Sequence, residues 1–223
     1  MGTLYIVATP IGNLEDITLR ALRILKEACF ILCEDTRVTK KLLNHFEIQI
    51  PTLSYHQHSN PEKMEYIFRL LLEGKNLVLV TDAGTPGISD PGNELVSFLS
   101  QKNQDVKIVP IPGVSAVAAI ASISGFPMDK FMFFGYPPHK NKRKKFFQEV
   151  AQSRYPVILY ESPYRIVKTL TELAEVSSNA SIVVGRELTK KFETVYRGTI
   201  DQALEKVQKD MVKGEFVLVI QNQ

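Results

Sequence analysis

The 223-residue sequence contains few cysteines and no long apolar run. Cys29 and Cys33 are too few for a disulfide framework, and they lack the additional cysteines of a typical zinc site. His56 and His58 also stand without a cluster of metal ligands, so no metal is expected. No apolar stretch approaches the roughly 20 residues of a membrane span, and the N-terminus begins with a predicted strand instead of a secretory signal. These absences favour a soluble cytoplasmic protein with reduced thiols.

Two common phosphate-binding fingerprints are missing as well. The sequence contains neither GxGxxG nor GxxxxGK[S/T], which argues against ordinary Rossmann and P-loop sites. The net charge of +3, from 27 basic and 24 acidic side chains, is too small to indicate an anionic partner by itself. What the chain does have is a hydrophobic content of 44%, which is ample for a folded core.

Residues 77–92 join a buried-type strand to a loop rich in glycine and proline. Residues 77–80 form a short apolar run that is typical of a strand covered on both faces. The loop contains Gly84, Gly87 and Gly92, and glycine permits positive φ and close backbone approach to a ligand. In open α/β sheets, ligands bind beyond the carboxyl ends of the strands. The stretch therefore predicts a ligand cradle, and the alternative is an ordinary strand-to-helix turn.

The first half of the chain alternates predicted strands and helices. Asp16 is expected to cap the first helix, which runs to about Ala28. This order favours a mostly parallel sheet with right-handed crossovers. In the second half, several strands lack intervening helices, which favours an α+β arrangement with antiparallel pairs. Strands are predicted at residues 4–8, 30–33, 51–55, 77–80, 106–109, 131–134, 156–160, 181–184 and 215–221.

Two carboxylates and an arginine follow the predicted strand at residues 30–33. They are Glu34, Asp35 and Arg37, and their position predicts that they lie on the ligand-binding edge of the sheet. The alternative is that Asp35 or Thr36 caps the next helix and that Arg37 forms a surface salt bridge.

The segment from Lys140 to Lys145 carries the positive excess of the chain. Five of its six residues are cationic, and aromatic residues stand beside it. Runs of charge are usually solvated helix faces. We nevertheless favour an anion-binding lip here, with nucleic acid as the leading anion.

The predicted helix at residues 114–124 begins with small side chains. Ser115 and Ala116, followed by further alanines, make this helix slim. Small side chains allow a backbone or a ligand to approach closely, although an alanine-rich packing helix explains the pattern equally well.

Six motifs in order carry a resemblance that extends over nearly the whole chain. They are ATPIGNLEDITLRAL from Ala8, CEDTRVTKKLL from Cys33, TDAGTPGISDPG from Thr81, PIPGVSA from Pro110, YESPYR from Tyr160 and GRELTKKFE from Gly185. The chain resembles the ribosomal RNA small subunit methyltransferase I family, which are cytidine 2'-O-methyltransferases of the tetrapyrrole methylase superfamily.

This resemblance implies S-adenosylmethionine (SAM) as the methyl donor and a homodimer. It also implies two α/β domains with the cofactor in their cleft. The expected domains are residues 1–112, with a mostly parallel sheet, and residues 113–223, with a mixed α+β sheet. By position, the resemblance implies that the cofactor contacts are Pro10, Ile11, Ala83, Gly84, Thr85, Ile88, Ser115, Ala116 and Tyr160.

The chain also departs from the family pattern. Tyr164 stands where the family commonly has histidine. Many members carry a C-terminal extension that this sequence lacks, and its loss is expected to weaken RNA docking.

Methyl transfer to a ribose hydroxyl requires in-line positioning and a nearby base. The candidate bases are Asp35, Glu161 and Glu34, because each follows a predicted strand. A small-molecule methylase of tetrapyrrole type and a non-catalytic RNA- or SAM-binding protein are the alternatives. Ribosomal RNA of the small subunit is the expected partner, with phosphate contacts predicted at Arg37, Lys140, Lys142, Arg143, Lys144, Lys145 and Arg165.

Overall fold

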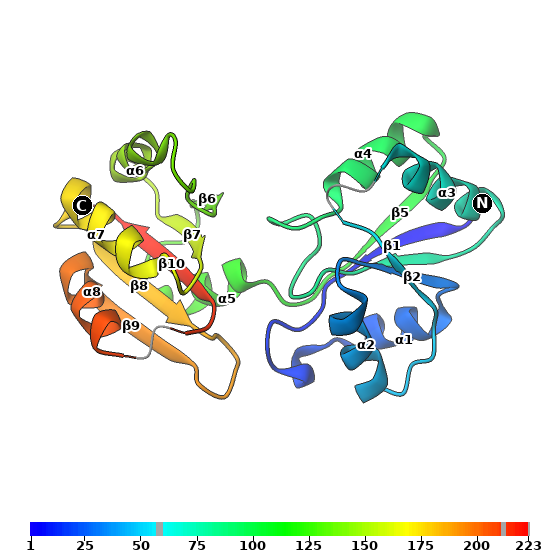
Figure 1. Ribbon diagram of the computed structural model, residues 1–223, viewed down its shortest axis with the longest axis horizontal. Helices are drawn as coiled ribbons and strands as arrows, with labels where there is room; N and C mark the ends of the chain where they lie inside the picture. The colour runs from blue at the N-terminus through cyan, green and yellow to red at the C-terminus, as the bar shows by residue number, and fades with distance from the viewer. Residues whose placement is uncertain (57–59, 211–212, 223) are drawn as a thin grey trace. The chain divides into compact units, whose positions relative to one another are not determined.

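The chain divides into two compact units, Met1–Ser115 and Ala116–Gln223. The computed structural model describes residues 1–56, 60–210 and 213–222 (Figure 1). The division falls slightly after the expected boundary at residue 112, because the turn that follows the last strand of the first unit packs with that unit. His58 lies outside the described residues. No helix among the described residues is long and apolar enough to cross a membrane.

The first unit is built on a sheet of parallel strands. Its strand order is β3-β2-β4-β1-β5, and every pair of neighbours is parallel. The sheet therefore confirms the fold expected for the first half of the chain. The strands are β1 (Thr3–Val7), β2 (Phe30–Cys33), β3 (Thr52–Ser54), β4 (Leu77–Leu79) and β5 (Lys107–Ile111).

Helices cover both faces of this sheet. On strand β4, Leu77 and Leu79 point to one face and Val78 to the other, as the two-residue period of a strand requires. Val78 packs with apolar residues of α1 and α2, whereas Leu77 and Leu79 pack with those of α3 and α4. The helices are α1 (Leu19–Glu27), α2 (Thr36–His45), α3 (Pro61–Leu72) and α4 (Asn93–Lys102).

The first helix begins later than the sequence indicated. Asp16 lies in a short 3-10 turn, Leu14–Asp16, and the N-cap of α1 is Thr18, whose hydroxyl accepts a hydrogen bond from the Ala21 N–H at 3.1 Å. The prediction that Asp16 caps this helix was wrong. Thr18 is also a good capping residue, and both positions precede the same apolar pattern, so the sequence does not separate them.

The second unit contains a mixed sheet with the order β6-β7-β10-β8-β9. Strands β6 and β7 are parallel, and the other neighbouring pairs are antiparallel. This arrangement confirms the α+β expectation for the second half. The strands are β6 (Met132–Gly135), β7 (Val157–Glu161), β8 (Ser181–Arg186), β9 (Thr194–Thr199) and β10 (Phe216–Gln221).

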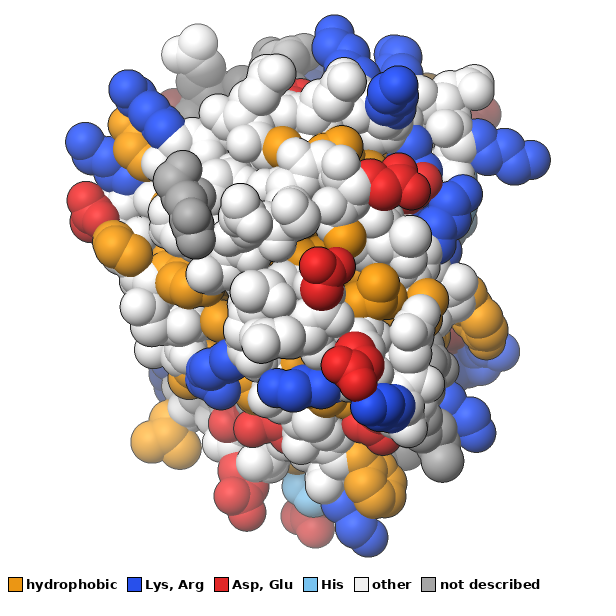
Figure 2. All heavy atoms as spheres, turned by 90° about the vertical axis from the view of Figure 1, so that its left-hand side faces the viewer, with side chains coloured by type: hydrophobic (Ala, Val, Ile, Leu, Met, Phe, Trp, Pro, Cys, Tyr) orange, Lys and Arg blue, Asp and Glu red, His pale blue; other side chains and the backbone are white. Residues whose placement is uncertain are grey.

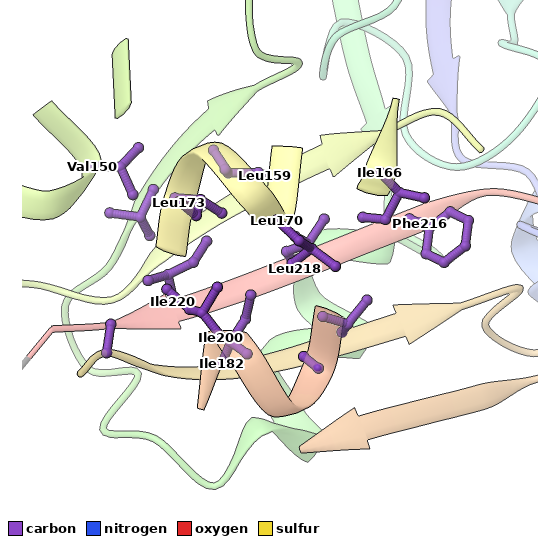
Figure 3. Close-up of a cluster of buried hydrophobic side chains, with 14 of the residues drawn as sticks. Val150, Leu159, Ile166, Leu170, Leu173, Ile182, Ile200, Phe216, Leu218 and Ile220 are labelled. Atoms are coloured by element: carbon purple, nitrogen blue, oxygen red, sulfur yellow. The ribbon is translucent and has the colours of Figure 1, made fainter. Parts of the chain in front are cut away.

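Three helices cover one face of the mixed sheet, namely α6 (Arg143–Gln152), α7 (Ile166–Ser177) and α8 (Ile200–Lys209). Figure 3 shows the resulting core, in which Leu170 and Leu173 of α7 lie among Leu159 of β7 and Leu218 of β10. All four of these side chains are fully buried. At about 1.5–3 kcal/mol for each fully buried leucine, this layer holds the helices on the sheet.

Helix α5 (Ala116–Ser124) packs on the other face of the mixed sheet, against β10. Gly185 of β8 shows how closely the helix approaches, because a Cβ atom there would lie 2.9 Å from the Cδ1 atom of Ile120. The close approach here is thus made by Gly185 of the sheet and the large side chain of Ile120, which is fully buried.

Candidate functional site

Two loops of the first unit are locked together beyond the carboxyl ends of β1 and β4. The backbone N–H of Thr9 donates to the carbonyl of Gly84 at 2.9 Å, and the N–H of Gly84 donates to the carbonyl of Thr9 at 3.0 Å. The Thr9 hydroxyl also donates to the Thr81 carbonyl at 3.1 Å. Because β1 and β4 are adjacent and parallel, their loops emerge at the same edge of the sheet.

A third loop, which follows β5, joins the same group. The Thr85 hydroxyl donates to the carbonyl of Val114 at 3.0 Å. Gly113 packs tightly on the loop after β1, since a Cβ atom there would lie 3.0 Å from the Cβ atom of Ala8. These contacts bring together three of the predicted cofactor residues, Ile11, Gly84 and Thr85. Three more, Pro10, Ala83 and Ser115, are direct chain neighbours of residues in these contacts.

The remaining predicted cofactor residues of these loops are placed differently. Ile88 lies further along the loop after β4, and 39% of its surface is exposed. Ala116 is the first residue of α5.

The backbone conformation at position 84 favours glycine, whereas the surrounding atoms leave room for a Cβ atom. The φ of Gly84 is +83°, a region that costs most L-residues about 1–2 kcal/mol. A Cβ atom at this position would lie 3.4 Å from the nearest atom, the Cγ2 of Ile11, which is ordinary packing distance. Gly87 has the same φ but is crowded, because a Cβ atom there would lie 2.7 Å from Asn93 Oδ1.

Acidic side chains gather at the same edge, beyond β2 and β4. The Asp35 N–H donates to Asp82 Oδ1 at 3.2 Å, which joins the two neighbouring strand ends. Asp82 was missed by the sequence analysis, although the rule that selected Glu34 and Asp35 applies equally to a carboxylate directly after β4. The part of the chain that the structure describes contains no group of three His, Cys, Asp or Glu side chains arranged to hold a metal ion.

Asp35 caps the next helix, which is the structural alternative that the sequence left open. It is the N-cap of α2 and accepts the Arg37 N–H at 2.8 Å, while the Arg37 guanidinium pairs with its carboxylate at 2.6 Å. These hydrogen bonds to Arg37 lower the pKa of Asp35 to about 2. The carboxylate is therefore fully ionised at neutral pH.

The pKa values of Glu34 and Asp82 are shifted in the opposite direction, upward. Partial removal from water raises the pKa of Glu34, and the negative charge of Asp82 raises it further. Desolvation likewise raises the pKa of Asp82, although the hydrogen bond from the Asp35 N–H offsets part of this increase. The edge thus carries one strongly acidic carboxyl beside two with raised proton affinity.

In the second unit, Glu161 belongs to a buried polar network at the end of β7. Its side chain has no exposed surface. One carboxylate oxygen accepts the Ser162 N–H at 2.8 Å, and the other accepts the Thr169 hydroxyl at 2.6 Å. Arg165 Nε lies 3.5 Å from the first of these oxygens. This environment suits a structural or positioning group better than a solvent-accessible base.

Two of the arginines assigned to RNA are also part of this network. The Arg143 side chain is only 6% exposed and donates to Glu172 at 2.6 Å, to the Thr169 hydroxyl at 2.7 Å and to the Pro138 carbonyl at 2.9 Å. Arg165, 17% exposed, donates to the carbonyl oxygens of Pro137 and Pro138. Their hydrogen-bonding groups face the protein, so neither is placed to contact a phosphate in this structure.

The lysines around Arg143 behave as the sequence predicted for a cationic surface. Lys140, Lys142, Lys144 and Lys145 are all exposed. None of them takes part in an ion pair with another described residue. Figure 2 shows Lys and Arg side chains projecting along the upper margin of the second unit, the height at which Figure 1 places α6. Arg37 is also exposed, but its guanidinium forms a salt bridge with the Asp35 carboxylate.

Tyr160 lies at the end of β7 within a group of aromatic rings. Its ring centroid is 5.0 Å from that of Phe133 and 5.5 Å from that of Tyr136, and both contacts are edge-to-face. Such contacts fix the orientation of a ring. Tyr160 is thus a rigid, half-buried residue of the second unit.

Comparisons with known proteins agree with this architecture. A family model described as Tetrapyrrole (Corrin/Porphyrin) Methylases matches residues 3–204. The cobalt precorrin-4 methyltransferase of cobalamin biosynthesis has a TM-score of 0.70 at 20% identity, covering 98% of this chain and 94% of that one. A Thermus thermophilus uroporphyrin-III C-methyltransferase, solved with S-adenosylhomocysteine, has a TM-score of 0.65 at 19% identity, with 98% and 97% covered. The fold is that of a tetrapyrrole methylase.

Relatives with higher sequence identity show to which family within this fold the chain belongs. Ribosomal RNA small subunit methyltransferase I of Synechocystis is 46% identical over 99% of this chain and 79% of its own length. The proteins of the same name from Halalkalibacterium halodurans and Thermotoga maritima are 44% and 40% identical over 99% of this chain, and 76% and 98% of their lengths are covered. The chain belongs to the ribosomal RNA small subunit methyltransferase I family.

Proposed function

We propose that this chain transfers a methyl group from SAM to the 2'-hydroxyl of a cytidine ribose in 16S ribosomal RNA of the small subunit. The names of its relatives support ribosomal RNA as the substrate, and family membership supports methyl transfer. The cytidine and the ribose hydroxyl come from the motif resemblance. The interlocked loops after β1, β4 and β5 carry the proposal, because they form a backbone-lined cradle at the ligand edge of a parallel sheet.

The residues of the first unit fit SAM, which presents an adenosine and an amino-acid end to be held by hydrogen bonds. Gly84 is buried within the interlocked loops, and its lack of a side chain keeps a Cβ atom out of this part of the cradle. The Thr81 hydroxyl is buried and has no hydrogen-bond partner among the described residues, so it is available to a bound group. Pro10, Ile11 and Ser115 complete the proposed contacts of this unit, and Tyr160 is the proposed contact of the second unit.

When bound, SAM supplies a methyl group activated by a sulfonium. The protein must align the acceptor hydroxyl and take up its proton. Alignment alone can contribute about 7–11 kcal/mol, and a positioned base adds roughly 10²- to 10⁴-fold in rate. In this displacement the bond from methyl to sulfur breaks as the bond from methyl to the ribose oxygen forms. The sulfonium becomes a neutral thioether, and the hydroxyl proton passes to the base.

Among the three candidate bases we place Glu34 first. A base works best when its pKa is close to the working pH, and the pKa of Glu34 is raised whereas that of Asp35 is held at about 2 by Arg37. Glu161 is fully buried with both oxygens engaged. Asp35 then acts as the group that fixes Arg37 and the start of α2 beside the base.

The experiment is a methylation assay with labelled SAM and purified small ribosomal subunits. Label should enter 16S RNA, and the modified linkage should resist alkaline cleavage because its 2'-hydroxyl is blocked. Glu34→Gln should lower single-turnover methylation by about 10²-fold or more with SAM affinity retained, whereas the exposed control Glu62→Gln should match the wild type. A Glu34→Gln variant with the wild-type rate transfers the assignment to Asp35 or Glu161, which Asp35→Asn and Glu161→Gln then separate.

The two alternative functions give different results in the same assay. A small-molecule methylase would label a uroporphyrin-type tetrapyrrole and leave the ribosomal subunit unlabelled. A non-catalytic protein would bind SAM or RNA in a calorimeter but label neither. The exposed lysines Lys140, Lys142, Lys144 and Lys145 favour the RNA substrate, because a cationic surface recruits a polyanion. We further propose that the protein works as a homodimer in the cytoplasm, where ribosomal RNA is found.

A further inference from the structure

Two loops of the second unit lie at one edge of its sheet. The loop after β6 spans residues 136–142, and the turn after β7 spans residues 162–165. Because β6 and β7 are parallel neighbours, both connections leave the sheet at its carboxyl edge. We call these two segments together the β6–β7 edge.

The guanidinium groups of Arg143, which is buried, and Arg165, which is partly buried, hold the longer loop in place. Arg165 donates to the carbonyl groups of Pro137 and Pro138, and Arg143 donates to the Pro138 carbonyl at 2.9 Å. Behind them, Glu172 and Glu161 provide the opposite charges. Charge-assisted hydrogen bonds of this kind are about twice as strong as neutral ones. The loop is therefore preorganised and loses little further freedom when a ligand binds.

The β6–β7 edge presents two tyrosine rings to solvent. Tyr136 is 53% exposed, and Tyr164, in the turn after β7, is 96% exposed. A tyrosine so little covered contributes almost nothing to the core, so packing does not explain its position. Tyr136 also makes an edge-to-face contact with the ring of Tyr160, while about half of its surface stays exposed.

Exposed lysines follow Tyr136 in the same connection between β6 and α6. Lys140 and Lys142 belong to the same loop, and Lys144 and Lys145 begin α6. Exposed aromatic faces beside a cationic surface are the combination with which proteins bind single-stranded nucleic acid, since bases stack on the rings and phosphates pair with the cations. An RNA duplex keeps its bases stacked inside and cannot use such rings.

We infer that Tyr136 and Tyr164 form a stacking platform for unpaired bases of the RNA substrate, positioned by the Arg143 and Arg165 contacts to Pro137 and Pro138. The inference rests on the proposed function in that RNA is the substrate. It assigns Arg143 of the basic segment, together with Arg165, to the support of the platform and the lysines to the phosphates.

The test is direct binding, measured by fluorescence anisotropy with a labelled single-stranded RNA of about 12 nucleotides. Tyr136→Ala and Tyr164→Ala should each weaken binding by about 5- to 150-fold, the range that loss of one base stack produces. Tyr136→Phe and Tyr164→Phe keep the ring and should bind within about twofold of the wild type. Tyr66→Ala, which removes a 38%-exposed tyrosine of α3 in the first unit, is the matched control and should change nothing.

A duplex of the same sequence provides the second arm, and its affinity should be equal in the wild type and the alanine variants. The inference is overturned if both alanine variants bind the single strand like the wild type, or if they weaken duplex binding equally. The methylation assay reports separately on the proposed function. If binding of the single strand depends on the two tyrosine rings but 16S RNA is not methylated, the platform is supported and the proposed enzymatic function is refuted. If 16S RNA is methylated but binding does not depend on the rings, the enzymatic function is supported and the platform is refuted.

Discussion

Arg143 and Lys144 are neighbours in one basic segment, yet the structure predicts opposite consequences when each is replaced by methionine. Arg143→Met removes the partner of Glu172 and three hydrogen bonds from a side chain that is 6% exposed. Lys144→Met removes an exposed ammonium that has no ion-pair partner among the described residues. The first change should affect folding, and the second should affect RNA binding.

The magnitude for Arg143 follows from its surroundings. Removing one partner of a buried ion pair costs about 3–5 kcal/mol. Glu172 remains 26% exposed and has Lys168 at 4.0 Å, so part of its charge stays compensated. We therefore expect a loss of about 2–4 kcal/mol in the free energy of unfolding of the second unit. With a urea m-value of about 2 kcal/mol/M, the midpoint should fall by about 1–2 M.

The assay is urea denaturation followed by circular dichroism, combined with RNA binding at several salt concentrations. Arg143→Lys keeps the charge but not the planar fork of donors, so it should lose most of the same stability. Arg143→Met should leave the salt slope of RNA binding unchanged, whereas Lys144→Met should reduce it by about 0.7. An unchanged urea midpoint in Arg143→Met, with a reduced salt slope, would show that Arg143 is a phosphate contact after all.

Three other changes test the first unit and the lysines. Because asparagine tolerates positive φ, Gly84→Asn should fold like the wild type but lose SAM affinity in calorimetry, whereas Gly84→Val should lose stability as well. Full SAM affinity in folded Gly84→Asn would place the loop outside the site. Asp35→Asn can still cap α2, and it should reduce the stability loss that the wild type shows as the pH falls from about 4 to about 2, because the folded-state pKa of Asp35 is depressed. The same acid limb of urea midpoints in both proteins would contradict this assignment. Replacing four lysines should flatten the salt dependence of RNA binding by up to about 3 units relative to a control that replaces Lys26, Lys107, Lys206 and Lys209. The four are Lys140→Gln, Lys144→Gln, Lys145→Gln and Lys142→Asn, the last because Lys142 has a φ of +66°.

The sequence predicted the class of each sheet and every described strand except β9, because buried strands leave a strong local signal. The apolar run from Leu77 to Val80 appears as β4 in the middle of the first sheet. Helix starts were harder to place, as Asp16 and Thr18 illustrate, since several good capping residues can precede one apolar pattern. Local preference alone does not choose among them.

Side-chain roles within the site were less predictable. Composition marks Arg143 as one more cation of a basic run, and only the packing of α6 against α7 shows that its guanidinium faces inward. The same holds for Glu161, which looks like a surface residue after a strand but is fully buried beside the partly buried Arg165. Their partners Thr169 and Glu172 lie on a helix and carry no motif, so pairwise contacts in space decide what the residues do.

Parallel pairing explains where the functional side chains gather in each unit. In the first sheet, adjacent parallel strands bring the loops of β1, β4 and β5 to one edge, together with the acidic ends of β2 and β4. In the second sheet, β6 and β7 are the only parallel pair among the described strands. An antiparallel pair would send Tyr136 and Tyr164 to opposite ends of the sheet, where no single RNA segment could stack on both rings. The parallel β6–β7 pair is thus the feature that makes the proposed platform geometrically possible.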